Sequence, residues 1–205
     1  MKTSSFSAHL LAFLTILCIT SQITPIQAIQ PPNTTPKYTE FLKASCKTTL
    51  YPELCYNSLS NHARAFQTSP QMLANAALSV TLSTTRSTTA MISRMSKGAN
   101  IRPREAGALR DCLEELNDAV SELQRSIKEM SHMKGGAKKL GLKMSNIQTW
   151  VSAALTDEDA CMDGFGGKRN AIDEKLKKVV REKIVKICHL TSNSLALINC
   201  YASSM

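Results

Sequence analysis

Two amphipathic segments that each carry one cysteine lie between Asp111 and Phe165, and they limit the possible folds more than any other feature. In both segments apolar residues recur at steps of three and four, which is the spacing of a helix with one buried face. In the first segment these residues are Leu109, Cys112, Leu113, Leu116, Val120, Leu123, Ile127 and Met130, and in the second they are Ile147, Trp150, Val151 and Ala154. A disulfide between Cys112 and Cys161 would hold the two helices side by side and antiparallel. We therefore predict an all-α fold in which the other helices are added around this pair.

The first 28 residues show the pattern of a secretory signal peptide. Lys2 is followed by an apolar run from Leu10 to Ile19, and Ala28 supplies a small residue at the cleavage position. This run is shorter than a membrane-spanning helix requires, and no later segment is apolar enough to cross a bilayer. We predict that residues 1–28 are removed and that the mature protein is secreted without a membrane anchor. The alternative is an uncleaved anchor.

The segment after the predicted cleavage site, residues 29–37, is rich in proline and has no hydrophobic periodicity. Such a composition indicates a disordered lead-in. It contains the sequence Asn33-Thr34-Thr35, which is an acceptor for N-linked glycosylation. We predict that Asn33 carries a glycan.

Cysteine usage indicates disulfides. Removal of Cys18 with the signal peptide leaves six of the seven cysteines. An even number in a secreted chain favours disulfides over metal binding, because the compartment is oxidising. Cys46 and Cys55 are nine residues apart on either side of a turn at Pro52, a spacing that suits a bridge within a helical hairpin.

The last two cysteines, Cys188 and Cys200, are twelve residues apart on one predicted helix. At a rise of 1.5 Å per residue they would stand roughly 18 Å apart, which is too far for a disulfide. They can pair only if this helix breaks or the C-terminus turns back. We predict the bridges Cys46–Cys55 and Cys112–Cys161, with Cys188 and Cys200 free or engaged between chains.

Helix start signals divide the rest of the chain. We expect a hairpin of two short helices over 38–60, followed by a bundle of four long helices over 69–203. The long helices are expected to begin at Ser69-Pro70, at Pro103, at Ser145 or Asn146 after a loop over 134–143, and at Asn170 or Asp173. Trp150, the only tryptophan, is expected to anchor the core of the third long helix.

The first long helix carries many hydroxyl side chains. We assign its buried stripe to Met72, Leu73, Ala76, Val80, Met91 and Met95, and its outer face to Thr81, Ser83, Thr84, Thr85, Ser87, Thr88 and Thr89. These small side chains would let a neighbouring helix approach closely or would form a partner surface, and we favour the packing explanation.

The last long helix has an apolar side and a basic side. Its buried residues are predicted to be Ile172, Leu176, Val180, Ile184, Ile187, Leu195 and Ile198, and its outer cations are Lys175, Lys177, Lys178, Arg181, Lys183 and Lys186. A solvated face is the favoured interpretation of these cations, and contact with an acidic polymer or partner is the alternative.

No motif supports catalysis, cofactor binding or metal binding. The chain has no nucleophile elbow, HExxH, P-loop or dinucleotide fingerprint, and the histidines of the mature chain are scattered. The acids around Cys161 lack the glycine and the closing glutamate of an EF-hand loop. Nucleic acid is a poor candidate partner, because no aromatic residues alternate with the cations. We expect a secreted binding module without cofactors or metal ions, and not an enzyme.

Three stretches of the sequence resemble a known family. The hairpin CKTTLYPELC, together with DCLEELNDAVSEL and TWVSAALTDEDACMDGF, is similar to the plant invertase and pectin methylesterase inhibitors from about Thr39 to Ala202. This resemblance implies an N-terminal helical hairpin beside an up-down-up-down four-helix bundle, with one disulfide in the hairpin and one between the second and third bundle helices. It makes residues 38–203 an inhibitor domain.

The resemblance also implies a function. The chain lacks the Pro-Lys-Phe element of invertase inhibitors, and TWVSAALTDEDACMDGF is most like the pectin methylesterase branch. We therefore expect a secreted inhibitor of pectin methylesterase in the plant cell wall (the apoplast), which forms a non-covalent one-to-one complex and blocks the substrate cleft. The alternative is an inhibitor of cell-wall or vacuolar acid invertase.

Family contact positions carry over to four residues of this chain. They are Glu114 and Asp118 on the DCLEELNDA segment, and Ala160 and Asp163 around Cys161. Some relatives have threonine at the position of Ala160, which hydrogen-bonds the enzyme, and alanine cannot do so. The alternative for Glu114 and Asp118 is a structural role, because acids occur at these positions in both branches of the family.

Overall fold

The computed structural model describes residues 36–165 and 172–205, and every regular element in these ranges is helical. The predicted signal peptide, the glycosylation acceptor Asn33 and the helix start at Asn170 lie outside the described residues. Of the predicted lead-in 29–37, only Pro36 and Lys37 are described, and Lys37 belongs to α2. The elements are α2 (Lys37–Cys46), α3 (Pro52–Leu59), a 3-10 turn η2 (Ser60–His62), α4 (Ala63–Phe66), α5 (Pro70–Ser96), α6 (Pro103–Ser131), α7 (Ala137–Asp163) and α8 (Glu174–Ala202).

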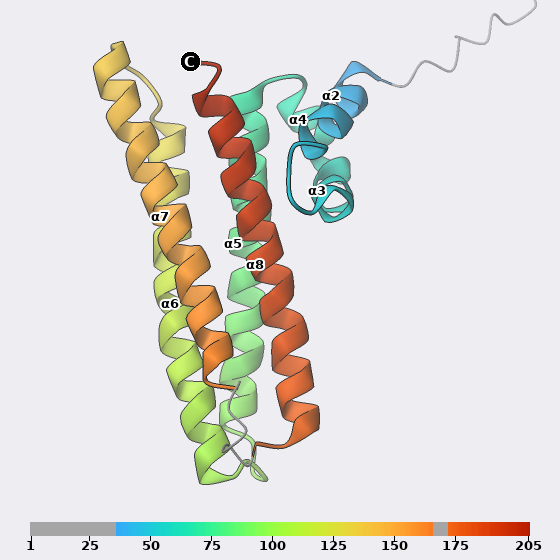
Figure 1. The fold of residues 1–205 in the computed structure, drawn as a ribbon, viewed down its shortest axis with the longest axis vertical. Helices are drawn as coiled ribbons and strands as arrows, with labels where there is room; N and C mark the ends of the chain where they lie inside the picture. Colours follow the sequence, from blue (N-terminus) through green and yellow to red (C-terminus); the bar gives the residue numbers. More distant parts are fainter. Residues whose placement is uncertain (1–35, 166–171) are drawn as a thin grey trace, which may run out of the picture. The chain divides into compact units, whose positions relative to one another are not determined.

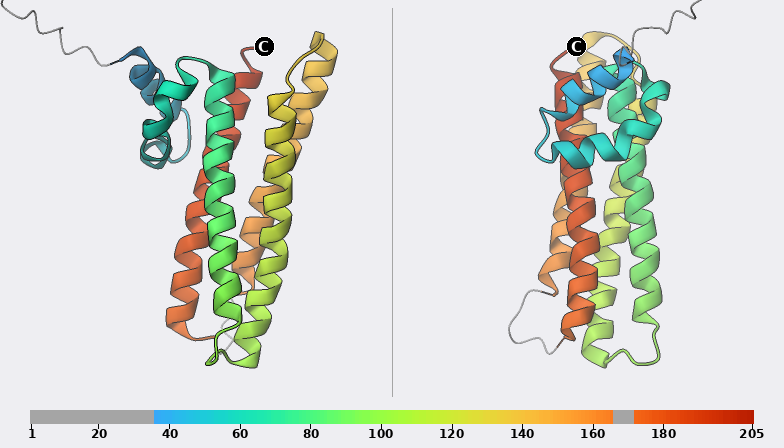
Figure 2. Two further views of the ribbon diagram at one scale, coloured as in Figure 1. Left: turned by 180° about the vertical axis from the view of Figure 1, so that it is seen from behind. Right: turned by 90° about the vertical axis from the view of Figure 1, so that its right-hand side faces the viewer.

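Four long helices, α5 to α8, form an up-down-up-down bundle within the unit Thr35–Met205 (Figure 1). Each successive helix runs antiparallel to the one before it, and α8 packs against both α5 and α7. The short helical segments α2, α3, η2 and α4 lie beside one end of α5 and α8 (Figure 2). The predicted fold class, a four-helix bundle preceded by a helical hairpin, is confirmed. Within the described residues, no helix is long and apolar enough to span a membrane.

Three of the long helices begin where the sequence predicts. The hydroxyl of Ser69 accepts a hydrogen bond from the backbone N–H of Met72 at 3.3 Å, and Pro70 occupies the first turn of α5. Pro103 occupies the first turn of α6. Asp173 caps α8, because its carboxylate accepts backbone hydrogen bonds from the first turn at 2.9 and 3.1 Å. These caps satisfy N–H groups that have no partner inside the helix.

The predicted start of α7 at Ser145 or Asn146 is wrong, because the helix begins at Ala137. Gly135 has φ of +132°, a conformation that side chains rarely adopt, and Gly136 follows as the cap. The segment after them consists largely of lysine, leucine and alanine, which are good helix formers. The glycine within it costs only about 1 kcal/mol relative to alanine.

The hydroxyl face assigned to the outside of α5 is partly inside the bundle. Thr81, Thr85 and Thr88 are buried, whereas Met72 is 50% exposed. The hydroxyl of Thr85 donates to the backbone carbonyl of Thr81 at 3.0 Å, and the hydroxyls of Thr81 and Ser194 lie 2.9 Å apart. Threonine can be buried in this way because the hydroxyl finds partners while the methyl group packs. The close-packing explanation therefore holds for these three residues.

Trp150 is not the core anchor that we predict from the sequence. It is only partly buried, and its neighbours Ile147 and Val151 on α7 are fully buried in its place. The predicted apolar side of α8 is confirmed except at Leu195, which is partly exposed. The buried members on α8 are Leu176, Val180, Ile184, Ile187 and Ile198, and Ile172 is buried just before the helix begins.

The predicted disulfide of the hairpin is present between Cys46 and Cys55, whose Cα atoms are 5.6 Å apart. A side chain of the bundle holds this hairpin. The Asn193 amide accepts a hydrogen bond from the backbone N–H of Tyr51 at 3.0 Å and donates one to its carbonyl at 2.9 Å. The ring of Tyr51 also stacks on His189, with centroids 3.5 Å apart. The sequence does not reveal this attachment, nor η2 and α4, which extend the hairpin toward α5.

Candidate functional site

The second predicted disulfide joins Cys112 on α6 to Cys161 on α7, with Cα atoms 4.2 Å apart. Because the two helices are antiparallel, residues that follow Cys112 lie opposite residues that precede Cys161. Both cysteines are buried. The bridge therefore sets the register of two helices near one end of the bundle. Cys188 is free and partly buried, and Cys200 is free and exposed, in agreement with the prediction that they do not pair with each other.

The four residues carried over from the family lie close to this bridge. Glu114 and Asp118 are exposed on α6 and one turn apart, so they lie on the same face of the helix. Ala160 is partly buried beside Cys161, and Asp163 is the exposed last residue of α7. Counted from the bridge at 1.5 Å per residue, Asp118 and Asp163 are separated by about 12 Å along the bundle. The structure thus gathers all four in a short stretch of the α6–α7 pair.

A further acid of α7, Asp157, faces acids of α6. The pKa of Asp157 is raised to about 6, first by burial and then by the negative charges of Glu115, Asp118 and Glu122. Sequence reasoning missed this group, although Glu115, Asp118 and Glu122 follow each other at helical spacing. The register set by the disulfide places Asp157 opposite residue 116 of α6, close to these acids. Applied to the sequence, this register could have revealed that Asp157 faces them.

These side chains form one negatively charged surface, which we call the α6–α7 acidic surface. Its members are Glu114, Glu115, Asp118, Glu122, Asp157 and Asp163. Among the described residues, the salt bridge recorded for this surface is the one from Arg125 to Glu122, at 3.0 Å. Glu114, Asp118 and Asp163 are exposed to solvent.

Glu158, next to Asp157, points into the bundle instead. Its side chain is fully buried, and its Oε1 accepts hydrogen bonds from Thr191 on α8 at 2.9 Å and from Thr85 on α5 at 3.3 Å. Burial raises the pKa of Glu158 to about 8, and the two hydroxyls only partly oppose this shift. In the sequence Glu158 belongs to the group of acids around Cys161, together with Asp157, Asp159 and Asp163. Its spacing from Val151, Ala154 and Cys161 follows the buried stripe of α7 and could have revealed its position.

Nothing in the described part of the chain resembles a metal centre: no group of three or more histidine, cysteine or acidic side chains is arranged to hold an ion there. The α6–α7 acidic surface thus consists of carboxylates on two helices that the Cys112–Cys161 disulfide cross-links.

Comparison with known proteins agrees with this architecture. Residues 40–197 match the family model for the plant invertase/pectin methylesterase inhibitors. The chain is 44% identical over 167 residues to a "21 kDa protein" from Daucus carota, covering 80% of this chain and 84% of that protein. It is 40% identical over 204 residues to pectinesterase inhibitor 11 from Arabidopsis thaliana, covering 98% of both chains. A crystal structure of a mutant form of a pectin methylesterase inhibitor from Arabidopsis has the same fold, with a TM-score of 0.59 at 23% identity over 75% of this chain and 92% of that one.

The fold and the comparisons define a small helical protein of the inhibitor class, an enzyme inhibitor rather than an enzyme. The chain belongs to the plant invertase/pectin methylesterase inhibitor family.

Proposed function

We propose that this protein inhibits a plant pectin methylesterase by binding it non-covalently, one to one, with the α6–α7 acidic surface across the substrate cleft. The observation that carries the proposal is the cluster of carboxylates held on two helices by the Cys112–Cys161 bridge. Such a surface is preorganised, so little conformational entropy is lost on binding. Methylated pectin is then excluded sterically from the cleft, and the inhibitor needs no catalytic group.

The charges predict the character of the partner's surface. Glu114, Asp118 and Asp163 are exposed, and we assign them to contacts with basic side chains of the enzyme. Ala160 has no hydroxyl and contributes only an apolar contact at a position where relatives with threonine donate a hydrogen bond. We therefore expect enzymes that rely on that hydrogen bond to bind more weakly than others.

Asp157 makes the proposed contact sensitive to pH. Its pKa of about 6 means that it gains a negative charge as the pH rises through this value. Binding to a basic partner favours the charged form, so affinity should increase between about pH 5 and about pH 7. The Asp157→Asn variant should lose most of this dependence in titrations at the two pH values. An equally steep dependence of affinity on pH in the variant would show that Asp157 is not its cause.

We further propose residues 38–203 as the inhibitor domain, and residues 1–28 as a signal peptide that directs the protein to the cell wall. Export would form the two disulfides in an oxidising compartment. Mass spectrometry of the secreted protein from plant tissue would show an N-terminus at Ile29 and a glycan on Asn33. Retention of residues 1–28 would contradict this part of the proposal.

The discriminating experiment mixes the purified protein with a plant pectin methylesterase and, separately, with an acid invertase, and follows both activities from about pH 5 to about pH 7.5. We expect inhibition of the esterase at micromolar protein and none of the invertase. Inhibition of invertase alone would replace the proposed target with the alternative one. Activity of both enzymes unchanged throughout would refute inhibition of either.

A further inference from the structure

The turn between α6 and α7 carries a second charged surface, of the opposite sign to the proposed enzyme contact. We call it the basic tip, and its members are Lys134, Lys138, Lys139 and Lys143. The first three are exposed, and Lys143 is partly buried. Figure 1 shows this turn at the end of the bundle where the chain terminates. Lys139 lies about 27 Å along α7 from Asp157, so the tip is outside the α6–α7 acidic surface.

The charge of the basic tip is not balanced by neighbouring acids. The sequence contains no aspartate or glutamate between Glu129 and Asp157, so no acid stands three or four residues from any lysine of the tip. None of the salt bridges within the described ranges includes these lysines. The tip is therefore a concentration of positive charge without an acidic partner among the described residues.

Helix structure accounts for one of the four lysines. The ammonium group of Lys143 donates a hydrogen bond to the backbone carbonyl of His132, where the C-terminus of α6 favours a cation. Lys138 and Lys139 lie instead in the first turn of α7, which contains no acid and has no side-chain cap. The helix dipole favours anions at such a position. The two lysines are thus unfavourable for the helix, which points to an external anion as their partner.

Gly141 is a second feature of the basic tip that the fold does not require. It lies inside α7, where glycine is less favourable than alanine, and a Cβ atom added to it would meet no atom within 4 Å. Lys138 and Leu142 share its face of the helix, and Leu142 is 62% exposed. An exposed glycine allows a ligand to approach the backbone closely. This face therefore offers a flat apolar strip beside a cation.

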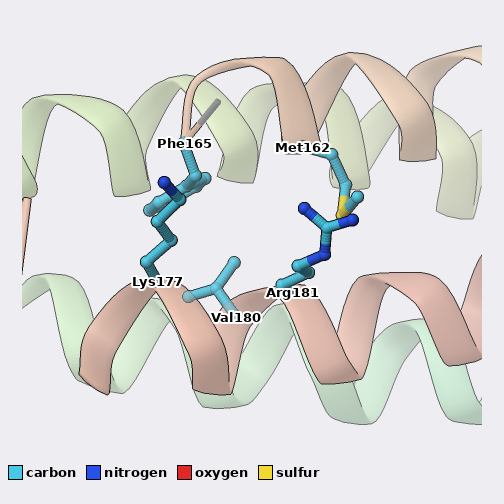
Figure 3. Close-up of a pocket in the computed structure, with 5 residues that line it drawn as sticks. All are labelled: Met162, Phe165, Lys177, Val180 and Arg181. Carbon is cyan, nitrogen blue, oxygen red and sulfur yellow. The ribbon is translucent and has the colours of Figure 1, made fainter. Parts of the chain in front are cut away.

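Cations also line a cavity at the opposite end of α7. In Figure 3, the side chains of Lys177 and Arg181 extend from α8 toward Met162 and Phe165. The cavity has a volume of about 20 Å³, which is room for roughly one water molecule, so no sugar ring fits inside. Lys177 also has a salt-bridge partner, Glu174, at 4.0 Å. The basic tip differs in both respects, because its lysines lie on an open surface and have no such partner in the described part of the chain.

We propose that the basic tip binds a linear polyuronate, the acidic polymer that remains after the methyl esters of pectin are hydrolysed. The choice of ligand rests on the proposed function: hydrolysis of each ester by the target enzyme consumes one water, releases methanol and a proton, and leaves one carboxylate on the polymer. The carboxylates pair with the lysines, and the C–H face of a sugar ring packs on Gly141 and Leu142. Binding of this product retains the inhibitor where the esterase has already acted.

Other anionic polymers fit the basic tip less well. Single-stranded nucleic acids are bound through aromatic side chains that stack on the bases, and residues 131–149 contain none. Membrane-surface helices need a broad apolar side that enters the lipid. Leu142 is the one residue of this segment among the exposed large hydrophobic residues of the described chain.

The test measures binding of the full mature protein to polygalacturonate, to fully methyl-esterified pectin and to anionic phospholipid vesicles, without any enzyme present. We expect binding to polygalacturonate that weakens between about 50 and about 200 mM salt, as for other polyelectrolytes. The esterified polymer should not bind, because it has lost the carboxylates. Equal binding to vesicles, or no binding to polygalacturonate at low salt, would overturn the assignment.

A pair of matched variants separates the basic tip from net charge. Lys134→Gln, Lys138→Gln and Lys139→Gln together should weaken polygalacturonate binding by at least about tenfold. Arg86→Gln, Arg94→Gln and Lys97→Gln remove the same charge from exposed positions of α5 and its end, and should change binding less than about twofold. Equal losses in both variants would contradict a defined site.

The Gly141→Ala variant tests the helix face without changing charge. Its added methyl group meets no atom of the protein, so the fold is kept, but it holds a sugar ring off the backbone and should weaken binding about threefold. Unchanged affinity would refute the contact at Gly141.

Inhibition assays separate this inference from the proposed function. The lysine variant of the basic tip should inhibit the esterase as the wild type does, because these lysines lie outside the α6–α7 acidic surface. A wild-type protein that inhibits without binding polyuronate refutes this inference alone, and one that binds polyuronate without inhibiting refutes only the proposed function.

Discussion

Glu158 is a carboxylic acid in the middle of the bundle, where it links three of the four long helices. Its only recorded partners within the described ranges are the hydroxyls of Thr85 and Thr191, which donate to Oε1, and Oε2 has none. Asp157 adds a negative charge from the same helix. On α8, Cys188 interacts electrostatically with Glu158, and its thiol is also kept neutral because burial raises its pKa to about 12. Among the described residues no salt bridge joins Glu158 to a cation, and burial favours its protonated form.

The raised pKa of Glu158 makes stability depend on pH. Its contribution to the free energy of unfolding is fully present below the unfolded pKa of about 4.5 and is lost as the pH rises through about 8. Asp157 acts in the same direction with a pKa of about 6. We predict that Glu158→Gln is more stable than the wild type at pH 8 and unfolds at a higher urea concentration. The difference in the free energy of unfolding should be several kcal/mol, at about 1.4 kcal/mol per unit of pKa. At pH 5 the two proteins should be nearly equal.

The exposed Glu114→Gln variant serves as the control for this measurement, because it makes the same chemical change outside the core. It should follow the wild type at both pH values. If Glu158→Gln is instead destabilised at pH 8 as strongly as at pH 5, Glu158 is ionised in the folded protein and its buried charge is compensated by a partner that we have not identified.

At the scale of single helices, the two disulfides close loops of very different length. Cys112 and Cys161 are 49 residues apart, whereas Cys46 and Cys55 are nine apart. By the loop-closure model, the longer loop should contribute about 4 kcal/mol to the free energy of unfolding and the shorter loop about 2.5 kcal/mol. Urea unfolding of the Cys112→Ala/Cys161→Ala and Cys46→Ala/Cys55→Ala variants measures both values. A larger loss of unfolding free energy on removal of the hairpin disulfide would show that strain or residual structure, and not loop length, determines how much each disulfide contributes.

The hairpin depends on the hydrogen bonds between Asn193 and the backbone of Tyr51. Asn193 is buried, so Asn193→Ala leaves two backbone groups of Tyr51 without partners, at a cost of about 1–3 kcal/mol. We predict faster hydrogen exchange over residues 37–66 and unchanged exchange in α6 and α7. Glu182→Ala, an exposed substitution on the same helix, is the control. Slower exchange in the hairpin of the Asn193 variant would contradict this attachment.

The helices themselves were largely predictable, and the errors have identifiable causes. Proline and capping residues mark the starts of α5, α6 and α8, because these signals are local. The sequence does not predict the start of α7, because glycine next to lysine and leucine is compatible with a loop as well as with a helix. On α5 the burial of Thr81 and Thr85 was missed because it depends on Ser194 and Glu158, which belong to other helices.

At the scale of the molecule, acidic and basic side chains gather on different helices. The chain has a formal net charge of +9, yet the α6–α7 acidic surface is negative, whereas the cations of the first half of α8 are Lys175, Lys177, Lys178, Arg181, Lys183 and Lys186. The positions of Glu114, Asp118, Ala160 and Asp163 could be proposed from sequence similarity alone. That Asp157 joins them follows from the register between α6 and α7, which the disulfide defines, whereas the buried position of Glu158 follows from its place in the apolar stripe of α7.

The central claim is that the α6–α7 acidic surface binds the esterase, and a charge-reversal titration tests it most directly. The dissociation constant of the complex with a plant pectin methylesterase would be measured for the wild type, for Glu114→Lys/Asp118→Lys, and for Glu40→Lys/Glu53→Lys. The last pair makes the same change at exposed positions of the hairpin. We predict that the α6 pair weakens binding by at least about tenfold and that the hairpin pair changes it less than about threefold. Equal affinity of the α6 pair and the wild type, with both proteins folded, would contradict the account.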